Sequence, residues 1–133
     1  MSLDDCYCDY DPPEFCRMAV HKARSEHICT ECGSTIFPGE RYEYTSGKWD
    51  GSFSVFKVCT GCLNIRTWTQ NNLPCLCWAY GHIIEDCIDA VEAVYDSAGG
   101  STEDIAGLKF GLLRKIVERN RINKQKKMKG VLT

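Results

Sequence analysis

Long apolar runs are missing from this chain of 133 residues. A membrane-spanning helix needs about 20 consecutive apolar residues, and no stretch approaches that length. The first residues include aspartates, whereas a secretory signal begins with basic residues followed by an apolar segment. We therefore expect a soluble, cytoplasmic protein with no membrane partner.

Catalytic motifs are also missing. The chain contains no glycine-rich phosphate-binding loop, no Gly-x-Ser-x-Gly nucleophile elbow and no His-Glu-x-x-His zinc-protease motif. Each of these motifs positions a reacting group or a phosphate. Their absence predicts a protein that is not an enzyme and that takes no small-molecule substrate.

Cysteine, by contrast, is abundant, with ten in the chain. Without an export signal, metal binding explains them better than disulfides. The strongest motif is Cys29-Thr-Glu-Cys32 followed, after 26 residues, by Cys59-Thr-Gly-Cys62. Two such turns can close a tetrahedron of thiolates around a structural zinc ion, with no position left for water. Iron binds the same ligands, but the predicted hairpin and helix around the site favour zinc.

The residues around these cysteines predict a turn, a hairpin and a helix. Gly33 suits a tight turn because it tolerates positive φ. Arg41 to Thr45 and Phe53 to Val58 have the composition of strands, and Asp50-Gly51 is a strong hairpin dipeptide. A short helical pattern follows the second cysteine pair and ends near Asn71-Asn72-Leu73-Pro74. This order resembles a treble-clef zinc finger, in which the free amides and dipole of a helix N-terminus stabilise the thiolates.

The regions on either side of the finger differ from it. Residues 1–16 are acidic and contain Pro12-Pro13, which predicts an extended arm. After residue 82, apolar residues recur at three- and four-residue steps in two segments separated by Ala98-Gly99-Gly100, which predicts a helical hairpin. We expect an α+β fold made of a zinc-binding module with its arm (1–81) and a helical hairpin with a basic tail (82–133).

Two Cys-x-Cys pairs flank the finger and form a candidate second metal site. Its ligands would be Cys6, Cys8, Cys75 and Cys77. Cys16, His82 and Cys87 are alternative ligands, although Cys87 belongs to an apolar stripe and is expected in the core. This spacing is a weaker signal than C-x-x-C, and free thiols in a reducing cytoplasm are the competing explanation. One zinc ion is predicted, and a second is left open.

Charge is distributed unevenly. From Lys109 to the end, nine basic residues face only Glu118, a net charge of +8, whereas the first 108 residues carry −10. A basic tail can bind phosphates, but cations also complement the C-terminal end of a helix, and the acidic body could mimic nucleic acid toward a basic partner. Trp49 is the hairpin aromatic expected to be exposed, whereas most of the others are expected in the core. The candidate partner-binding residues are Trp49, Arg119, Arg121, Lys124, Lys126 and Lys127.

A family resemblance covers residues 4–87. The motifs that carry it are Cys8-Asp9-Tyr10-Asp11-Pro12-Pro13-Glu14-Phe15, His27-x-Cys29-x-x-Cys32, Pro38-Gly39-Glu40-x-Tyr42, Gly47-x-Trp49-Asp50-Gly51 and Cys77-Trp78-Ala79-Tyr80-Gly81. Through them the chain resembles small zinc-finger proteins encoded by phages and prophages of proteobacteria. The resemblance implies a phage accessory protein in the cytoplasm of a bacterial host. An arm cysteine and the Cys75/Cys77 region recur in that family pattern, which favours the second metal site.

We therefore expect a non-enzymatic protein that binds a host or phage macromolecule, with a protein favoured, as a regulatory or anti-defence factor. The alternative is a nucleic-acid-binding protein that uses the basic C-terminal helix and the hairpin tip. Some treble clefs are HNH-type nucleases with a catalytic histidine on the hairpin, but Gly33 to Val58 contains no histidine.

Overall fold

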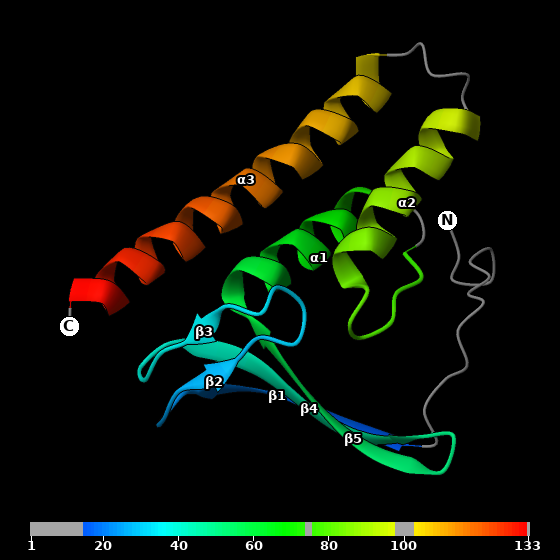
Figure 1. The fold of residues 1–133 in the computed structure, drawn as a ribbon. Coiled ribbons are helices and arrows are strands. Elements are labelled where there is room, and N and C mark those ends of the chain that lie inside the picture. Colours follow the sequence, from blue (N-terminus) through cyan, green and yellow to red (C-terminus); the bar gives the residue numbers. More distant parts are fainter. Residues whose placement is uncertain (1–14, 74–75, 98–102, 133) are drawn as a thin grey trace.

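A computed structural model describes residues 15–73, 76–97 and 103–132. The N-terminal part is β-structure and the rest is helical (Figure 1), so the α+β prediction is confirmed. The elements are β1 (Phe15–Lys22), β2 (His27–Ile28), β3 (Thr35–Ile36), β4 (Arg41–Trp49), β5 (Ser52–Cys59), α1 (Thr60–Asn72), α2 (Ile83–Ser97) and α3 (Glu103–Leu132). Within these described ranges, no helix is long and apolar enough to cross a membrane.

The predicted hairpin is formed by β4 and β5. Trp49 pairs with Ser52, so the loop contains only Asp50 and Gly51, and both have positive φ (49° and 80°). Two positive φ angles match the twist of the flanking strands, which is why this dipeptide favours a tight hairpin. Both strands are longer than predicted, because residues 46–49 continue β4 and β5 runs from Ser52 to Cys59.

Strand β1 was not predicted and extends the hairpin into a three-stranded antiparallel sheet of order β1-β4-β5. Its register runs from Phe15 opposite Lys48 to Lys22 opposite Arg41. Every side chain of β1 is exposed except Ala19, which is half-buried. An edge strand with no buried face shows no apolar alternation, so its sequence did not indicate a strand. Residues 1–14 of the predicted arm lie outside the described residues.

The short strands β2 and β3 form a separate two-stranded sheet that frames the first cysteine pair. β5 then ends at Cys59, and α1 begins at the next residue. Helix α1 stops at Asn72, as predicted from the Asn-Asn-Leu-Pro sequence. The predicted order of turn, hairpin and helix is therefore confirmed.

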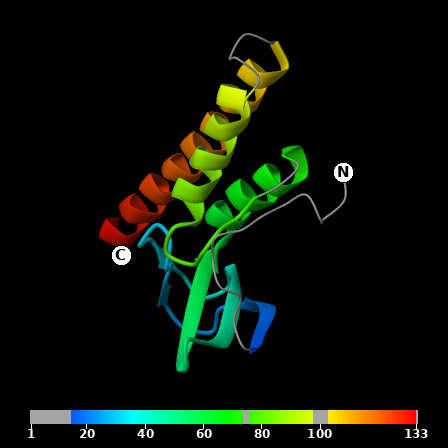
Figure 2. The same cartoon turned by 90° about the vertical axis from the view of Figure 1, so that its right-hand side faces the viewer.

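Helices α2 and α3 run antiparallel, side by side, and both pack against α1 (Figures 1 and 2). The core between the helices and the sheet contains Val58, Ile65, Ile83, Val91 and Leu112. The basic C-terminal segment continues as helix to Leu132. The predicted break at Ala98-Gly99-Gly100 lies outside the described residues.

A buried polar network joins the sheet to α1 and to the segment before α2. The guanidinium of Arg66 donates two hydrogen bonds to the carboxylate of Glu43 (2.9 and 2.6 Å) and stacks 4.7 Å above the ring of Trp78. The hydroxyl of Tyr80 donates to Glu43 (3.2 Å), and its ring stacks on Phe56 with centroids 4.4 Å apart. Burial raises the pKa of Tyr80 to about 12. The network fixes the inner face of the sheet against the helices.

Candidate metal centre

Four cysteine sulfurs converge at the junction of the turn, the hairpin and α1. Cys29 and Cys32 come from the turn between β2 and β3, Cys59 ends β5, and Cys62 lies in the first turn of α1. All four Sγ atoms lie within 4.8 Å of one another, and all four cysteines are free. The sulfurs of Cys29 and Cys62 are 3.9 Å apart and those of Cys32 and Cys59 3.7 Å. A tetrahedral ion with bonds of about 2.3 Å to sulfur requires about 3.8 Å between sulfurs. The cluster can therefore bind one metal ion.

The backbone of the turn is built to present its two sulfurs. Gly33 has a φ of 73°, and its amide donates to the carbonyl of Cys29 (3.0 Å), which closes the turn. The Ser34 hydroxyl lies 3.0 Å from the Cys32 sulfur, and the Cys59 amide donates to the Cys29 sulfur (3.4 Å). These contacts place partial positive charge against sulfur, as a thiolate requires.

The turn is also fixed to the sheet. Thr30 donates its backbone amide to the carbonyl of Lys57 (2.7 Å), and the Lys57 amide donates to the Thr30 hydroxyl (3.0 Å). Because β5 carries Cys59, this pair of bonds sets the distance between the two halves of the cluster.

The four cysteines of the cluster shift one another's pKa values. Hydrogen bonding from the Cys29 thiol is the main reason that the pKa of Cys32 lies well below its ordinary value. Hydrogen bonding to Cys29 is likewise the main reason that the pKa of Cys62 lies well above it. One sulfur thus gains its negative charge while a neighbour keeps its proton. A divalent cation stabilises all four thiolates together, and binding it releases the remaining protons.

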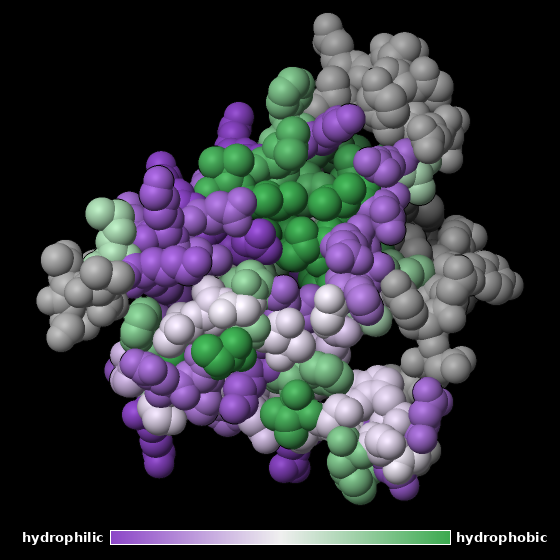
Figure 3. Space-filling view, in the orientation of Figure 1, coloured by the Kyte–Doolittle hydropathy of each residue, from purple (hydrophilic) through white to green (hydrophobic). Residues whose placement is uncertain are grey.

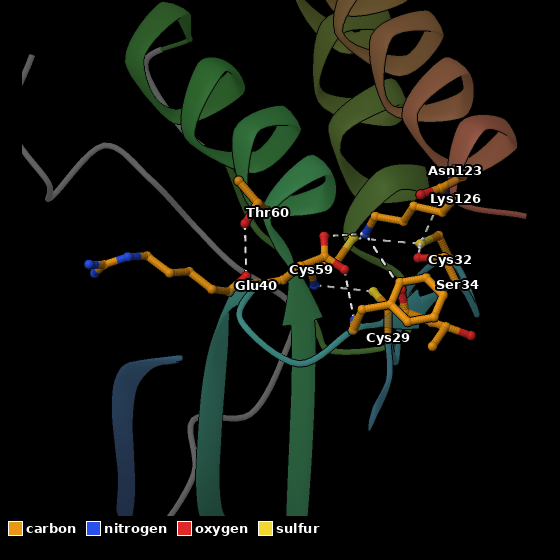
Figure 4. Close-up of polar contacts among 11 residues, drawn as sticks. Cys29, Cys32, Ser34, Glu40, Cys59, Thr60, Asn123 and Lys126 are labelled. Carbon is orange, nitrogen blue, oxygen red and sulfur yellow. Dashed lines mark hydrogen bonds and ion pairs between the residues drawn. The ribbon is translucent and has the colours of Figure 1, made fainter. Parts of the chain in front are cut away.

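Helix α3 covers the cluster from the outside. Arg119 directs Nη1 to the sulfur of Cys62 (3.7 Å), and Asn123 directs Nδ2 to the sulfur of Cys32 (3.6 Å). Lys126 forms an ion pair with Glu40 (2.8 Å) and approaches the carbonyl of Thr35 (3.5 Å). Figure 4 shows Asn123 and Lys126 projecting from α3 toward Cys32 and Glu40. The helix therefore provides donors and positive charge to a centre that four thiolates make negative.

Glycine allows this close approach. A Cβ atom on Gly61 would lie 2.7 Å from Cγ of Arg119, closer than two carbon atoms can pack. The glycine between Cys59 and Cys62 thus leaves space for the Arg119 stem over the start of α1.

The candidate partner-binding residues separate into two groups. Arg119 and Lys126 contact the metal centre and its turn, whereas the side chains of Arg121, Lys124 and Lys127 are exposed on α3. Trp49 is half-buried, because its ring lies over Gly47 and packs edge-on against Phe56 and Tyr80. Phe53 is the exposed aromatic of the hairpin instead, 74% exposed, although most of these aromatics were expected in the core.

Sequence reasoning missed two residues of the centre. Asn123 carried no signal beyond its place four residues after Arg119, which puts both on one helix face. Glu31, inside the first C-x-x-C, bonds to the start of α2, a contact that no local pattern indicates.

The candidate second metal site falls largely outside the described residues, which exclude Cys6, Cys8 and Cys75. Cys77 is disulfide-bonded. Among the alternative ligands, Cys16 is exposed and Cys87 is buried in the core, as predicted, where burial raises its pKa. His82 lies near Glu85. Within the described ranges, the cluster of Cys29, Cys32, Cys59 and Cys62 is the one group arranged to bind a metal ion.

Comparison with known proteins adds no relative. The chain matches no protein-family model, and no curated protein or solved structure is significantly similar to it.

Proposed function

We propose that Cys29, Cys32, Cys59 and Cys62 bind one structural zinc ion in a treble-clef-like finger, and that the protein is a non-enzymatic binding protein. The main support is the spacing of the four sulfurs, which suits a tetrahedral ion with no fifth ligand. The order of turn, hairpin and helix supports the treble-clef assignment. The cover formed by α3 supports a structural role, because a catalytic zinc needs an open position.

A protein partner is supported by an apolar surface on α3. Phe110, Leu113 and Val117 are 68%, 49% and 62% exposed on successive turns of this helix, and Ile88 of α2 is 37% exposed. Figure 3 shows apolar side chains gathered over α3 where it runs beside α2. Contiguous exposed apolar residues are typical of a protein-binding surface. In line with the resemblance to phage zinc-finger proteins, we propose a host protein as the partner.

Nucleic-acid binding by the basic helix has less support. Arg119 and Lys126 face the metal centre. Among the candidate binding residues of this helix, Arg121, Lys124 and Lys127 are the exposed cations that remain.

Metal content tests the structural assignment. Elemental analysis of the purified chain should give at least one zinc per molecule, and two would establish a second site. Cys59→Ser should lose the ion and unfold the finger, because the folding of such modules depends on metal. Cys16→Ser is the matched control, since Cys16 is a free, exposed cysteine. A metal-free sample with an unchanged circular dichroism spectrum and melting temperature would overturn the assignment.

Partner capture tests the binding role. Affinity purification from an infected or expressing host should recover a protein, and Val117→Glu should abolish its recovery while zinc content stays the same. Recovery that is unchanged in Val117→Glu would remove the α3 surface from the proposal.

A further inference from the structure

The negative charge of the chain is not located on its β-sheet part. Residues 15–73 contain seven basic and five acidic residues, and three of the acidic ones make internal contacts. Glu43 pairs with Arg66, Glu40 pairs with Lys126, and Glu31 binds backbone amides at the start of α2. The other two acidic residues are Glu26 and Asp50, whereas this part contains six basic residues besides Arg66: Arg17, Lys22, Arg24, Arg41, Lys48 and Lys57. This part of the chain therefore contains more basic than acidic residues, unlike the chain as a whole.

Strand register gathers part of this charge on one side of the sheet. One row of neighbours across β1, β4 and β5 is formed by Phe15, Lys48 and Phe53. The next row on the same side of the sheet, two residues away along each strand, is formed by Arg17, Ser46 and Val55. Because side chains alternate between the two faces, every second residue shares this side, which we call the outer sheet face. Its residues are Phe15, Arg17, Ala19, His21, Tyr42, Tyr44, Ser46, Lys48, Phe53, Val55, Lys57 and Cys59. None of them is acidic.

The outer sheet face is aromatic as well as basic. Phe53 is 74% exposed and Phe15 is 52% exposed, and their ring centroids lie 5.5 Å apart. The opposite face carries Glu43 and Phe56, which pack against Arg66 and Tyr80. Strands β4 and β5 thus pack this opposite face against the helices, and the outer sheet face presents exposed rings and cations.

We propose that the outer sheet face binds single-stranded nucleic acid. Bases would stack on Phe15 and Phe53, and the backbone phosphates would lie along Arg17 and Lys57. Exposed rings between cations are the arrangement that recognises unpaired bases, because every base has a π-face and every nucleotide carries a phosphate. A duplex offers no unstacked base to such a surface. The proposal rests neither on the metal nor on a protein partner of α3.

The test uses the zinc-loaded full chain and fluorescence anisotropy with labelled oligo-dT and oligo-U of about 20 nucleotides, and a duplex of equal length. We expect both single strands to bind more tightly than the duplex. Phe53→Ala should weaken binding roughly tenfold, the loss of one base stack. Arg17→Gln should reduce the slope of log K against log salt concentration by about 0.7, the loss of one phosphate contact.

Two control variants separate this surface from its neighbours. Met18→Ala changes an exposed residue of β1 on the opposite face, and Arg121→Gln removes an exposed cation of α3. Both should bind like the unchanged chain. The proposal is overturned if Arg121→Gln weakens binding while Phe53→Ala does not, because α3 is then the binding surface. Equal affinity for duplex and single strands, or no binding of either at low salt, also overturns it, and capture of a protein that depends on Phe53 would assign the face to a protein instead.

Discussion

The carboxylate of Glu31 accepts a hydrogen bond from the backbone amide of Ile83 (2.9 Å), 52 residues further along the chain. A second bond comes from the amide of Gly81 (2.6 Å). Glu31 lies between Cys29 and Cys32, and Ile83 is the first residue of α2. Amides at a helix N-terminus have no partners within the helix and carry the positive end of its dipole. The metal-binding turn therefore also caps α2.

Glu31→Gln tests this cap. The variant keeps an acceptor oxygen but loses the charge, so the free energy of unfolding should fall by about 1 kcal/mol. Zinc content should not change, because Glu31 is not a ligand. Urea unfolding measures the free energy of unfolding, and elemental analysis measures the zinc content. Glu26→Gln, a charge change at an exposed residue, should leave stability unchanged. Equal stability of the two variants would show that the charge of Glu31 does not stabilise the start of α2.

Arg119→Met tests the cover over the metal centre. Methionine preserves an unbranched apolar stem but removes the donor to the Cys62 sulfur. Groups that hydrogen-bond metal ligands typically change affinity by about 10- to 100-fold. We therefore expect at least tenfold tighter retention of zinc by the unchanged chain in competition with a chromogenic chelator. Arg121→Met is the control on the exposed side of the same helix. Equal zinc affinity of Arg119→Met and Arg121→Met would mean that the contact between Arg119 and the Cys62 sulfur does not help to hold the ion.

The sequence predicted those features that depend on neighbouring residues. Asp50-Gly51 specified a tight hairpin because its two positive φ angles are a local requirement. The C-x-x-C pairs predicted the cluster because two turns suffice to close a tetrahedron. The end of α1 followed from its local sequence as well.

Features that depend on distant residues were not predictable in this way. β1 is a strand because it pairs with β4, and its sequence carries no burial pattern. Arg119 and Lys126 looked like a binding tail, since helical periodicity shows which residues share a face but not what that face contacts. Trp49 looked exposed because it adjoins a turn, whereas Gly47 leaves space for its ring to fold back over the strand.

Removal of one partner from the buried Glu43–Arg66 pair should be costly. The side chains of both residues are 8% exposed, so Glu43→Gln leaves a buried guanidinium without a counter-charge. Loss of one partner in such a pair costs about 3–5 kcal/mol. Among the described residues, the buried Nε of Arg66 has no hydrogen-bond partner, so Glu43 supplies the acceptors that the guanidinium uses.

A double variant distinguishes the pair from simple packing. In Glu43→Leu with Arg66→Met, neither charge remains, and the free energy of unfolding should exceed that of either single variant. Urea unfolding of the unchanged chain, the two single variants and the double variant gives the coupling energy between the two side chains. Additive losses would mean that the two charges do not stabilise each other.

Two glycines of α3 should respond in opposite directions to the same substitution. A Cβ atom on Gly111 would clash with the Trp68 ring of α1, whereas a Cβ on Gly107 would have no atom of the described residues within 4 Å. Gly107→Ala should therefore gain about 0.5–1 kcal/mol from helix propensity alone. Gly111→Ala has the same gain in propensity but forces α3 away from α1, and overpacking of this kind costs about 1–3 kcal/mol. Thermal unfolding followed by tryptophan fluorescence should show a higher midpoint for the first variant and a lower one for the second. Stabilisation by both substitutions would show that α3 does not pack on Trp68.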